Sequence, residues 1–90
     1  MRRFIVERDM PGIGQVDSTT MGTIARTSCD AQREVGADVQ WVESYIADNK
    51  TYCVYMAENA EVVRRHGEIA GFPITAIREV RGMLDPTMAA

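Results

Sequence analysis

The order in which the hydrophobic periodicity changes along the chain is the feature that most constrains its fold. Residues 4–8 form a short β-like run, Phe-Ile-Val-Glu-Arg, and Pro11-Gly12 interrupts the chain soon after it. From residue 15 or 18 to residue 35, apolar and small side chains recur at steps of three and four, which predicts a helix. Gly36 provides a stop for that helix.

The middle of the chain predicts a β-hairpin. Residues 38–46 and 51–56 are rich in β-branched and aromatic side chains, and they flank the turn signal Asp48-Asn49. With a two-residue turn, Tyr45 pairs with Tyr52 and Trp41 with Met56. A turn one residue longer would reverse the cross-pairing.

A second helix is predicted from residue 58 or 59 to Gly71, with Pro73 just beyond it. Residues 74–81 predict the last strand. The order is therefore β-α-β-β-α-β, which is the α+β, ferredoxin-like βαββαβ plan. Right-handed crossovers then give a four-stranded antiparallel sheet of order 4-1-3-2, with both helices on one face.

This plan is favoured over two separate hairpins with loose helices, because the latter would leave the helical stripes uncovered. We expect one domain over residues 1–82 and a tail over residues 83–90. A domain of 90 residues has a small core, so association into a homodimer through the bare face or edge of the sheet is an expected remedy.

The charge balance and the cysteine count restrict the class of protein. Ten Lys and Arg against thirteen Asp and Glu leave a net charge of −3 with the signs interspersed, which argues against a nucleic-acid surface. No apolar run approaches the ~20 residues that span a bilayer, and the apolar stretch at the N-terminus is too short for a secretory signal. Two cysteines without an export signal predict reduced thiols and a cytoplasmic location.

The predicted topology gathers polar side chains toward one edge of the sheet. Glu7 and Asp9 lie at the end of the first strand, Cys53 near the start of the third, and His66 in the second helix. These four side chains are the candidate metal ligands, because carboxylate, thiolate and imidazole groups bind divalent transition metals.

His66 is the only histidine, and its helical position predicts that it faces the sheet. The simplest interpretation is a core histidine bonded to a carbonyl or to Tyr52, because a buried imidazole needs a partner for its ring nitrogens. Gly67 beside it indicates either a close approach of the helix or room for a ligand.

Alternation along the predicted strands divides the side chains between two faces. One face carries Trp41, Tyr45, Tyr52 and Val54 together with Phe4 and Val6; the other carries Glu7, Ser44, Cys53 and Tyr55. We expect the more apolar first face to meet the helices, which places Cys53 and Glu7 on the bare face and His66 on the opposite one.

Four segments resemble the small nickel-responsive protein family, which is also described as nickel-binding. They are Ile-Val-Glu-Arg-Asp-Met-Pro-Gly at 5–12, Trp-Val-Glu-Ser-Tyr-Ile at 41–46, Thr-Tyr-Cys-Val-Tyr-Met-Ala at 51–57 and Arg-His-Gly-Glu-Ile-Ala-Gly-Phe-Pro at 65–73. The Val-Arg-Gly-Met-Leu-Asp-Pro-Thr ending at 80–87 is similar as well. The resemblance implies a dimeric ferredoxin-like fold.

Two functions are expected from these observations, and a purely structural interaction domain that binds neither metal nor small molecule is the third possibility. The first is a cytoplasmic module for nickel or a similar divalent ion, serving storage, buffering or response, with Ni²⁺ held by Glu7, Asp9, Cys53 and His66. The second is a ferredoxin-like dimer that binds a small molecule and acts as a cofactor-independent monooxygenase or isomerase, with His66 as general base. Its pocket would lie between the second helix and the sheet and would be lined by Trp41, Tyr45, Tyr52 and Phe72.

Overall fold

The predicted order of strands and helices is confirmed in the computed structural model, which describes residues 1–89. The sheet contains β1 (Arg2–Asp9), β2 (Val39–Ala47), β3 (Lys50–Ala57) and β4 (Ala76–Glu79), and the helices are α1 (Ser18–Val35) and α2 (Ala60–Ala70). Two short 3₁₀ helices, η1 (Ile13–Gln15) and η2 (Pro86–Ala89), complete the elements. The spatial strand order β2-β3-β1-β4 is the predicted order read from the other edge.

The helix ends lie where local side chains predict them. Asp17 caps α1, its carboxylate accepting the Thr20 backbone N–H at 2.8 Å. Asn59 caps α2 in the same way by accepting the Val62 N–H at 3.1 Å. Gly71 ends α2 in the left-handed conformation, φ 78°.

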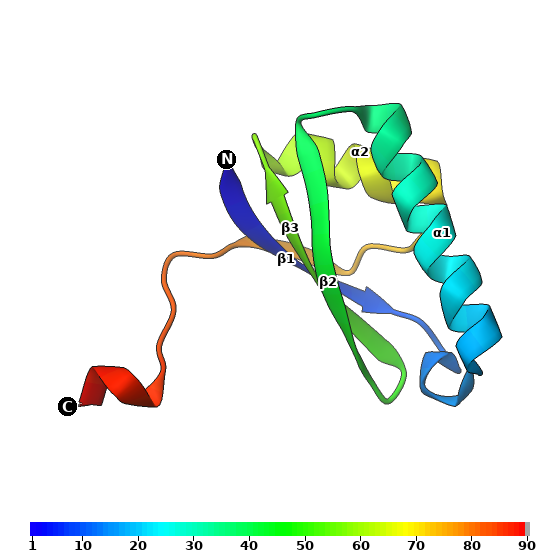
Figure 1. Cartoon of the computed structure of the whole chain (residues 1–90), viewed down its shortest axis with the longest axis horizontal. Helices are drawn as coiled ribbons and strands as arrows, with labels where there is room; N and C mark the ends of the chain where they lie inside the picture. Colours follow the sequence, from blue (N-terminus) through cyan, green and yellow to red (C-terminus); the bar gives the residue numbers. More distant parts are fainter. Residues whose placement is uncertain (90) are drawn as a thin grey trace.

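Both helices cover the same face of the sheet, and no helix or second sheet formed by residues 1–89 covers the other face (Figure 1). The core lies between the helices and the covered face, and it is formed by Phe4, Val6, Val39, Cys53, Tyr55, Ala57 and Val63. Beyond Met83 the chain runs away from the sheet toward η2 (Figure 1). Leu84, which precedes η2, is 94% exposed. The predicted tail spans this segment, and its last residue, 90, lies outside the described residues.

The hairpin register agrees with the prediction near the turn and departs from it farther away. Tyr45 pairs with Tyr52 around a two-residue turn, as predicted. Val42 is an extra residue in β2, a β-bulge, so Trp41 lies opposite Tyr55 and not opposite Met56. The bulge turns Trp41 toward the helices while Tyr45 stays on the uncovered face, so the prediction that both share one face is wrong.

The face predicted for Cys53 is also wrong. Phe4 and Val6 lie opposite Tyr55 and Cys53 in β3, so these four side chains share the covered face, where all are buried. The register of β1 against β3 places Cys53 beside Val6 on this face, and apolar character alone did not indicate that register. Glu7 does lie on the uncovered face, as predicted.

In the part of the chain that the structure describes, no helix is both long and apolar enough to cross a bilayer.

Candidate functional site

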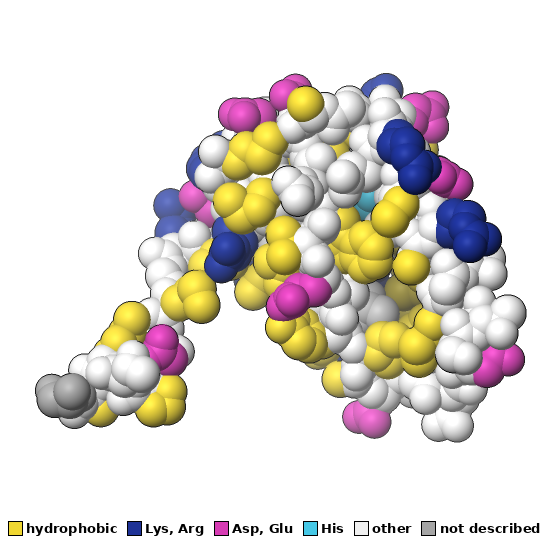
Figure 2. Space-filling model, in the orientation of Figure 1, with side chains coloured by type: hydrophobic (Ala, Val, Ile, Leu, Met, Phe, Trp, Pro, Cys, Tyr) yellow, Lys and Arg dark blue, Asp and Glu magenta, His cyan; other side chains and the backbone are white. Residues whose placement is uncertain are grey.

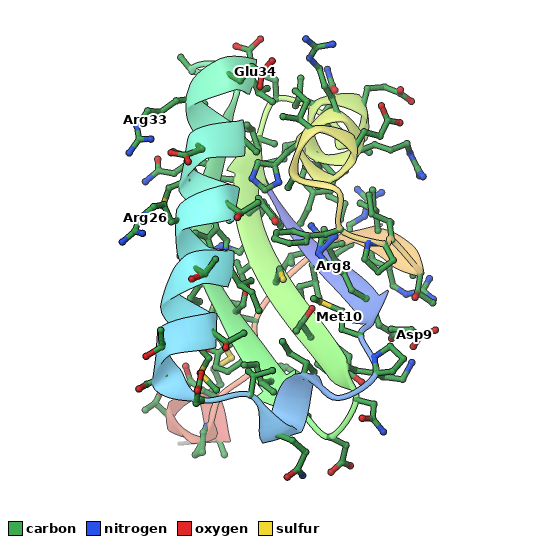
Figure 3. All side chains as sticks on the ribbon, turned by 90° about the vertical axis from the view of Figure 1, so that its right-hand side faces the viewer. Arg8, Asp9, Met10, Arg26, Arg33 and Glu34 are labelled. Carbon is green, nitrogen blue, oxygen red and sulfur yellow. The ribbon has the colours of Figure 1, made fainter. Side chains whose placement is uncertain are left out.

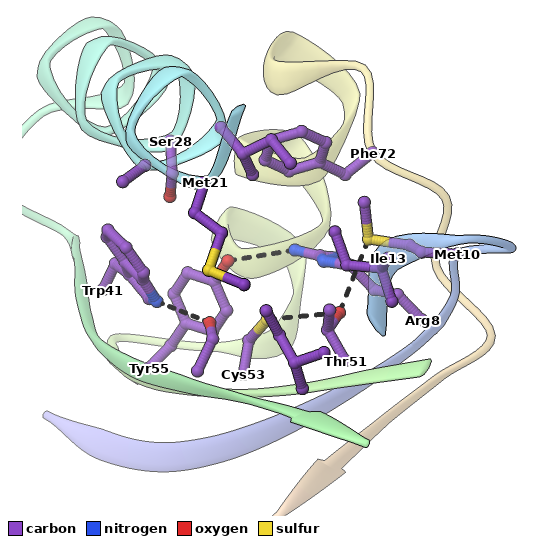
Figure 4. Close-up of a pocket in the computed structure, with 14 residues that line it drawn as sticks. Arg8, Met10, Ile13, Met21, Ser28, Trp41, Thr51, Cys53, Tyr55 and Phe72 are labelled. Atoms are coloured by element: carbon purple, nitrogen blue, oxygen red, sulfur yellow. Dashed lines mark hydrogen bonds between the residues drawn. The ribbon is translucent and has the colours of Figure 1, made fainter. Parts of the chain in front are cut away.

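A pocket of about 170 Å³ lies between the covered face of the sheet, α1 and η1 (Figure 4). Figure 2 shows hydrophobic side chains gathered around a hollow between β2 and α1. The apolar lining comes from η1, α1, β2 and the segments beside them: Met10, Ile13, Met21, Ile24, Ala25, Trp41, Ile46 and Phe72. The remaining lining residues are Arg8, Ser28, Ser44, Thr51, Cys53 and Tyr55.

Two walls of this pocket consist of residues that are regularly spaced in the sequence, one in α1 and one in β3. Met21, Ile24, Ala25 and Ser28 follow the i, i+3, i+4, i+7 spacing of one helix face. On the opposite wall, residues 51, 53 and 55 alternate along β3 and therefore point to the same side of the sheet.

The 3₁₀ helix η1 closes one end of the pocket. Ile13 of η1 is 4% exposed and lines the cavity. At Gly14 a Cβ atom would lie 2.6 Å from the backbone oxygen of Asp48, so the absence of a side chain allows η1 to pack directly on the β2–β3 turn. The hairpin turn thus sets where this wall of the pocket lies.

Arg8 gives the pocket one charged lining residue. Its side chain is almost fully buried, 1% exposed, and points from β1 into the space under the helices (Figure 3). Nη2 donates to the Tyr55 hydroxyl at 3.0 Å and Nη1 donates to the Pro73 carbonyl at 3.3 Å. The guanidinium also lies over the Tyr55 ring at 6.0 Å and the Phe72 ring at 5.7 Å. A buried charge costs several kcal/mol unless it is paired, so these partners carry a large share of its compensation.

Tyr55 joins the charged end of the pocket to the core. Burial raises the pKa of Tyr55, against the opposing effect of the Arg8 guanidinium, so the phenol stays protonated at neutral pH. Its ring packs edge-on against the His66 imidazole at a centroid distance of 5.1 Å.

His66 is a buried histidine that ties α2 to α1. It is 0% exposed, and Nε2 lies 3.0 Å from the Ser28 carbonyl oxygen, which only an N–H can satisfy. Nε2 is therefore the protonated nitrogen, and Nδ1 is left without a hydrogen-bond partner among the described residues. Burial lowers the pKa of His66, the Ser28 bond opposes this, and the Arg8 guanidinium lowers the pKa further.

Glu7 and Asp9 lie on the uncovered face, away from the pocket. Lys50 donates hydrogen bonds to both carboxylates, at 3.1 Å to Glu7 Oε2. Lys50 holds the pKa of Asp9 below its usual range, and the two carboxylates raise the pKa of Lys50.

The structure does not bring the four predicted metal ligands together. Cys53 and His66 are buried under the helices, whereas Glu7 and Asp9 lie on the opposite face because successive residues of β1 and β3 alternate. Among residues 1–89 no three His, Cys, Asp or Glu side chains form a group that could hold a metal ion. The predicted set therefore does not fit a nickel centre within one chain.

The four predicted pocket residues are also divided between the pocket and the uncovered face of the sheet. Trp41 and Phe72 line the pocket, as expected. Tyr45 and Tyr52 do not line it, because they lie opposite each other on the uncovered face, where Tyr45 is 57% exposed. The pocket also lies under α1 and η1, whereas the prediction placed it under α2.

Sequence reasoning missed Arg8, Ser28 and Tyr55 as site residues. The signal for Arg8 was present, because Phe4, Val6 and Arg8 alternate along β1 and so share one face. For Tyr55 the register of β1 against β3 was needed, which no local pattern specifies.

The match to known proteins decides the family. Residues 4–80 match the family described as nickel responsive protein, SCO4226-like. The chain belongs to this family. Membership of the SCO4226-like family confirms the resemblance seen in the sequence segments.

A solved structure extends the comparison to the fold. SCO4226 from Streptomyces coelicolor A3(2) superposes with a TM-score of 0.75 at 21% identity, over 91% of this chain and 99% of that chain. This likeness confirms the ferredoxin-like fold for this member of the SCO4226-like family. No curated protein matches the chain.

Proposed function

We propose that this protein binds a small, largely apolar molecule in the pocket between α1, η1 and the sheet. The observation that carries the proposal is the pocket itself, with apolar walls and a few polar groups, which is the usual composition of a ligand site. A dry apolar cavity of about 150 Å³ accepts benzene. The volume here, about 170 Å³, therefore suits one six-membered ring with a few further atoms.

The geometry supports binding better than a reaction in which His66 acts as general base. His66 is not among the residues that line the pocket. Its Nε2 already donates to the Ser28 carbonyl, so this nitrogen has no lone pair with which to take the proton of the Ser28 hydroxyl at 3.4 Å. The role that these contacts support is structural.

Thermal unfolding in the presence of benzene, toluene and indole tests the proposal. A ligand at ten times its Kd adds about 1.4 kcal/mol, which raises the Tm of a domain this size by roughly 6–11 °C. Ala25→Phe fills the pocket and should abolish the shift, whereas the same change at the exposed Ala37 should leave the shift intact. No shift for wild type, or an equal shift for Ala25→Phe, would contradict the proposal.

Nickel binding is the second candidate, and it is favoured by membership of a family described as nickel-responsive. In this form the protein is a cytoplasmic module for nickel storage, buffering or response. Because the predicted donors are split between two faces, we propose Glu7 and Asp9 on the uncovered face as the carboxylate donors, with Ni²⁺ displacing Lys50 from both. A second copy of the chain would complete the set of ligands.

Exposed apolar side chains support a homodimer through the uncovered face. Ile5, Val42 and Tyr45 lie there and are 41%, 47% and 57% exposed. Covering them removes apolar surface from water, which favours association. Sedimentation at micromolar concentration should give the mass of a dimer, and Val42→Lys should shift the protein toward monomer; a wild-type monomer would contradict this assembly.

Calorimetric titration with Ni²⁺ separates the possible donors. Glu7→Gln combined with Asp9→Asn should abolish the heat of binding, while His66→Gln should preserve it. Loss in His66→Gln alone would contradict the surface site and favour the buried donors. Absence of heat with wild-type protein at tens of micromolar would reject nickel binding.

A further inference from the structure

The further inference rests on the proposed function and concerns the charged end of the same pocket. Arg8 is a buried cation without a carboxylate partner among the described residues. The cations that form ion pairs among residues 1–89 are Arg2, Arg33, Arg81 and Lys50. Glu7 and Asp9, the carboxylates nearest to Arg8 in the sequence, are bonded to Lys50 on the uncovered face. The positive charge of Arg8 is thus not balanced by a carboxylate of residues 1–89, and an anionic ligand could balance it.

The donor groups of Arg8 are only partly used. A guanidinium has five N–H groups in one plane and no acceptor. One N–H is bonded to the Tyr55 hydroxyl and one to the Pro73 carbonyl, so the other three have no partner among the described residues. The Tyr55 and Phe72 rings lie against the guanidinium and hold it at the pocket (Figure 4).

We infer that this end of the pocket binds a carboxylate, so that the ligand is a small monocarboxylic acid with an apolar body. A carboxylate accepts two parallel N–H groups from one guanidinium, which is the geometry that Arg presents. One cation lines the pocket, which favours a ligand with one negative charge over a dianionic phosphate. The apolar walls and the volume of about 170 Å³ limit the rest of the ligand to a single ring or a short branched chain.

A purely structural role is the alternative for Arg8. Its two hydrogen bonds connect β1 to Tyr55 of β3 and to Pro73 in the connection between α2 and β4. Such a role predicts no preference of the pocket for an anion over a neutral molecule of the same shape. A pair of probes that differ only in charge therefore distinguishes the two.

The experiment measures the Kd of benzoate and benzamide by calorimetry, and of 3-methylbutanoate and its amide as a second pair. Wild-type protein should bind each acid at least about 10-fold more tightly than its amide, because hydrogen bonds to charged groups are the stronger ones. Arg8→Met should reduce that ratio to about one. Arg64→Met removes a positive charge from the exposed face of α2 and should leave the ratio unchanged, which controls for net charge.

The results distinguish failure of the carboxylate inference from failure of the proposed binding function. Equal binding of acid and amide to wild-type protein would overturn the carboxylate inference while the binding function stands. Absence of binding by all four probes would overturn the binding function itself. If Arg8→Met does not fold, Arg8→Lys, which keeps the charge but loses the planar fork, should lower the ratio, and an unchanged ratio would contradict bidentate recognition.

Discussion

Changing His66 to Gln should remove a specific pH dependence from the stability of this protein. In the unfolded chain a histidine has a pKa of about 6.5, and burial lowers the pKa of His66 in the folded state. Below pH 6.5 the unfolded state therefore binds the proton more readily than the folded state does, so the free energy of unfolding decreases as the pH falls. The decrease is at most about 1.4 kcal/mol per pH unit, and it ends below the folded-state pKa.

Urea unfolding at pH 7.5, 6.5 and 5.5 measures this effect. Wild type should lose stability across the range, and His66→Gln should lose less, because the amide can still donate to the Ser28 carbonyl but does not titrate. The carboxylates with lowered pKa values, Asp9, Asp17 and Asp85, lose their contribution to stability below about pH 5 and leave this window clear. Identical pH dependence in the two proteins, or a wild type more stable at pH 5.5, would refute the buried neutral imidazole.

Two further predictions concern backbone positions. Gly14→Ala places a Cβ 2.6 Å from the Asp48 carbonyl oxygen and should destabilise the protein by about 1–3 kcal/mol; in Gly22→Ala, where nothing lies within 4 Å, helix propensity should instead add about 0.5–1 kcal/mol. Urea unfolding measures both changes in the free energy of unfolding. If Gly14→Ala and Gly22→Ala change it in the same direction, η1 does not pack on the hairpin turn. Asn59→Ala removes the cap on the Val62 N–H and should cost about 1 kcal/mol, whereas Asn59→Asp should retain most of the stability; equal losses for the two would contradict the cap.

The fold was predictable because the local signals agree with one another. Helical spacing between residues 18 and 35 stops at Gly36, the turn at 48–49 separates two β-rich runs, and Asn59 and Gly71 mark the ends of α2. Right-handed crossovers with both helices on one face then give the strand order 4-1-3-2. Agreement across these levels made the strand order predictable.

The site was less predictable because it depends on register. A single extra residue, Val42, changes the faces of the residues that precede it in β2 and separates Trp41 from Tyr45. The pairing of β1 with β3 joins segments about 50 residues apart, and no local pattern sets it. Consequently, Cys53 was predicted on the wrong face and the metal ligands were grouped across both faces.

The burial of Arg8 illustrates a different obstacle. Hydrophobicity places charged side chains at the surface, and that rule holds for most arginines in proteins. Alternation with Phe4 and Val6 indicates the opposite for Arg8, and the aromatic rings that accommodate it come from two other segments. A conflict between residue type and periodicity was therefore the signal for the site.

Methyl NMR during a titration with toluene locates a bound ligand and so tests most directly whether the pocket under α1 and η1 is the binding site. The methyl signals of Ile13, Met21 and Ile24 should shift with a common Kd, because these side chains line the pocket. The signals of Ile5 and Val42 on the uncovered face should remain in place. Shifts confined to Ile5 and Val42, or no shift at any of the five, would contradict the claim that the pocket under α1 and η1 is the binding site.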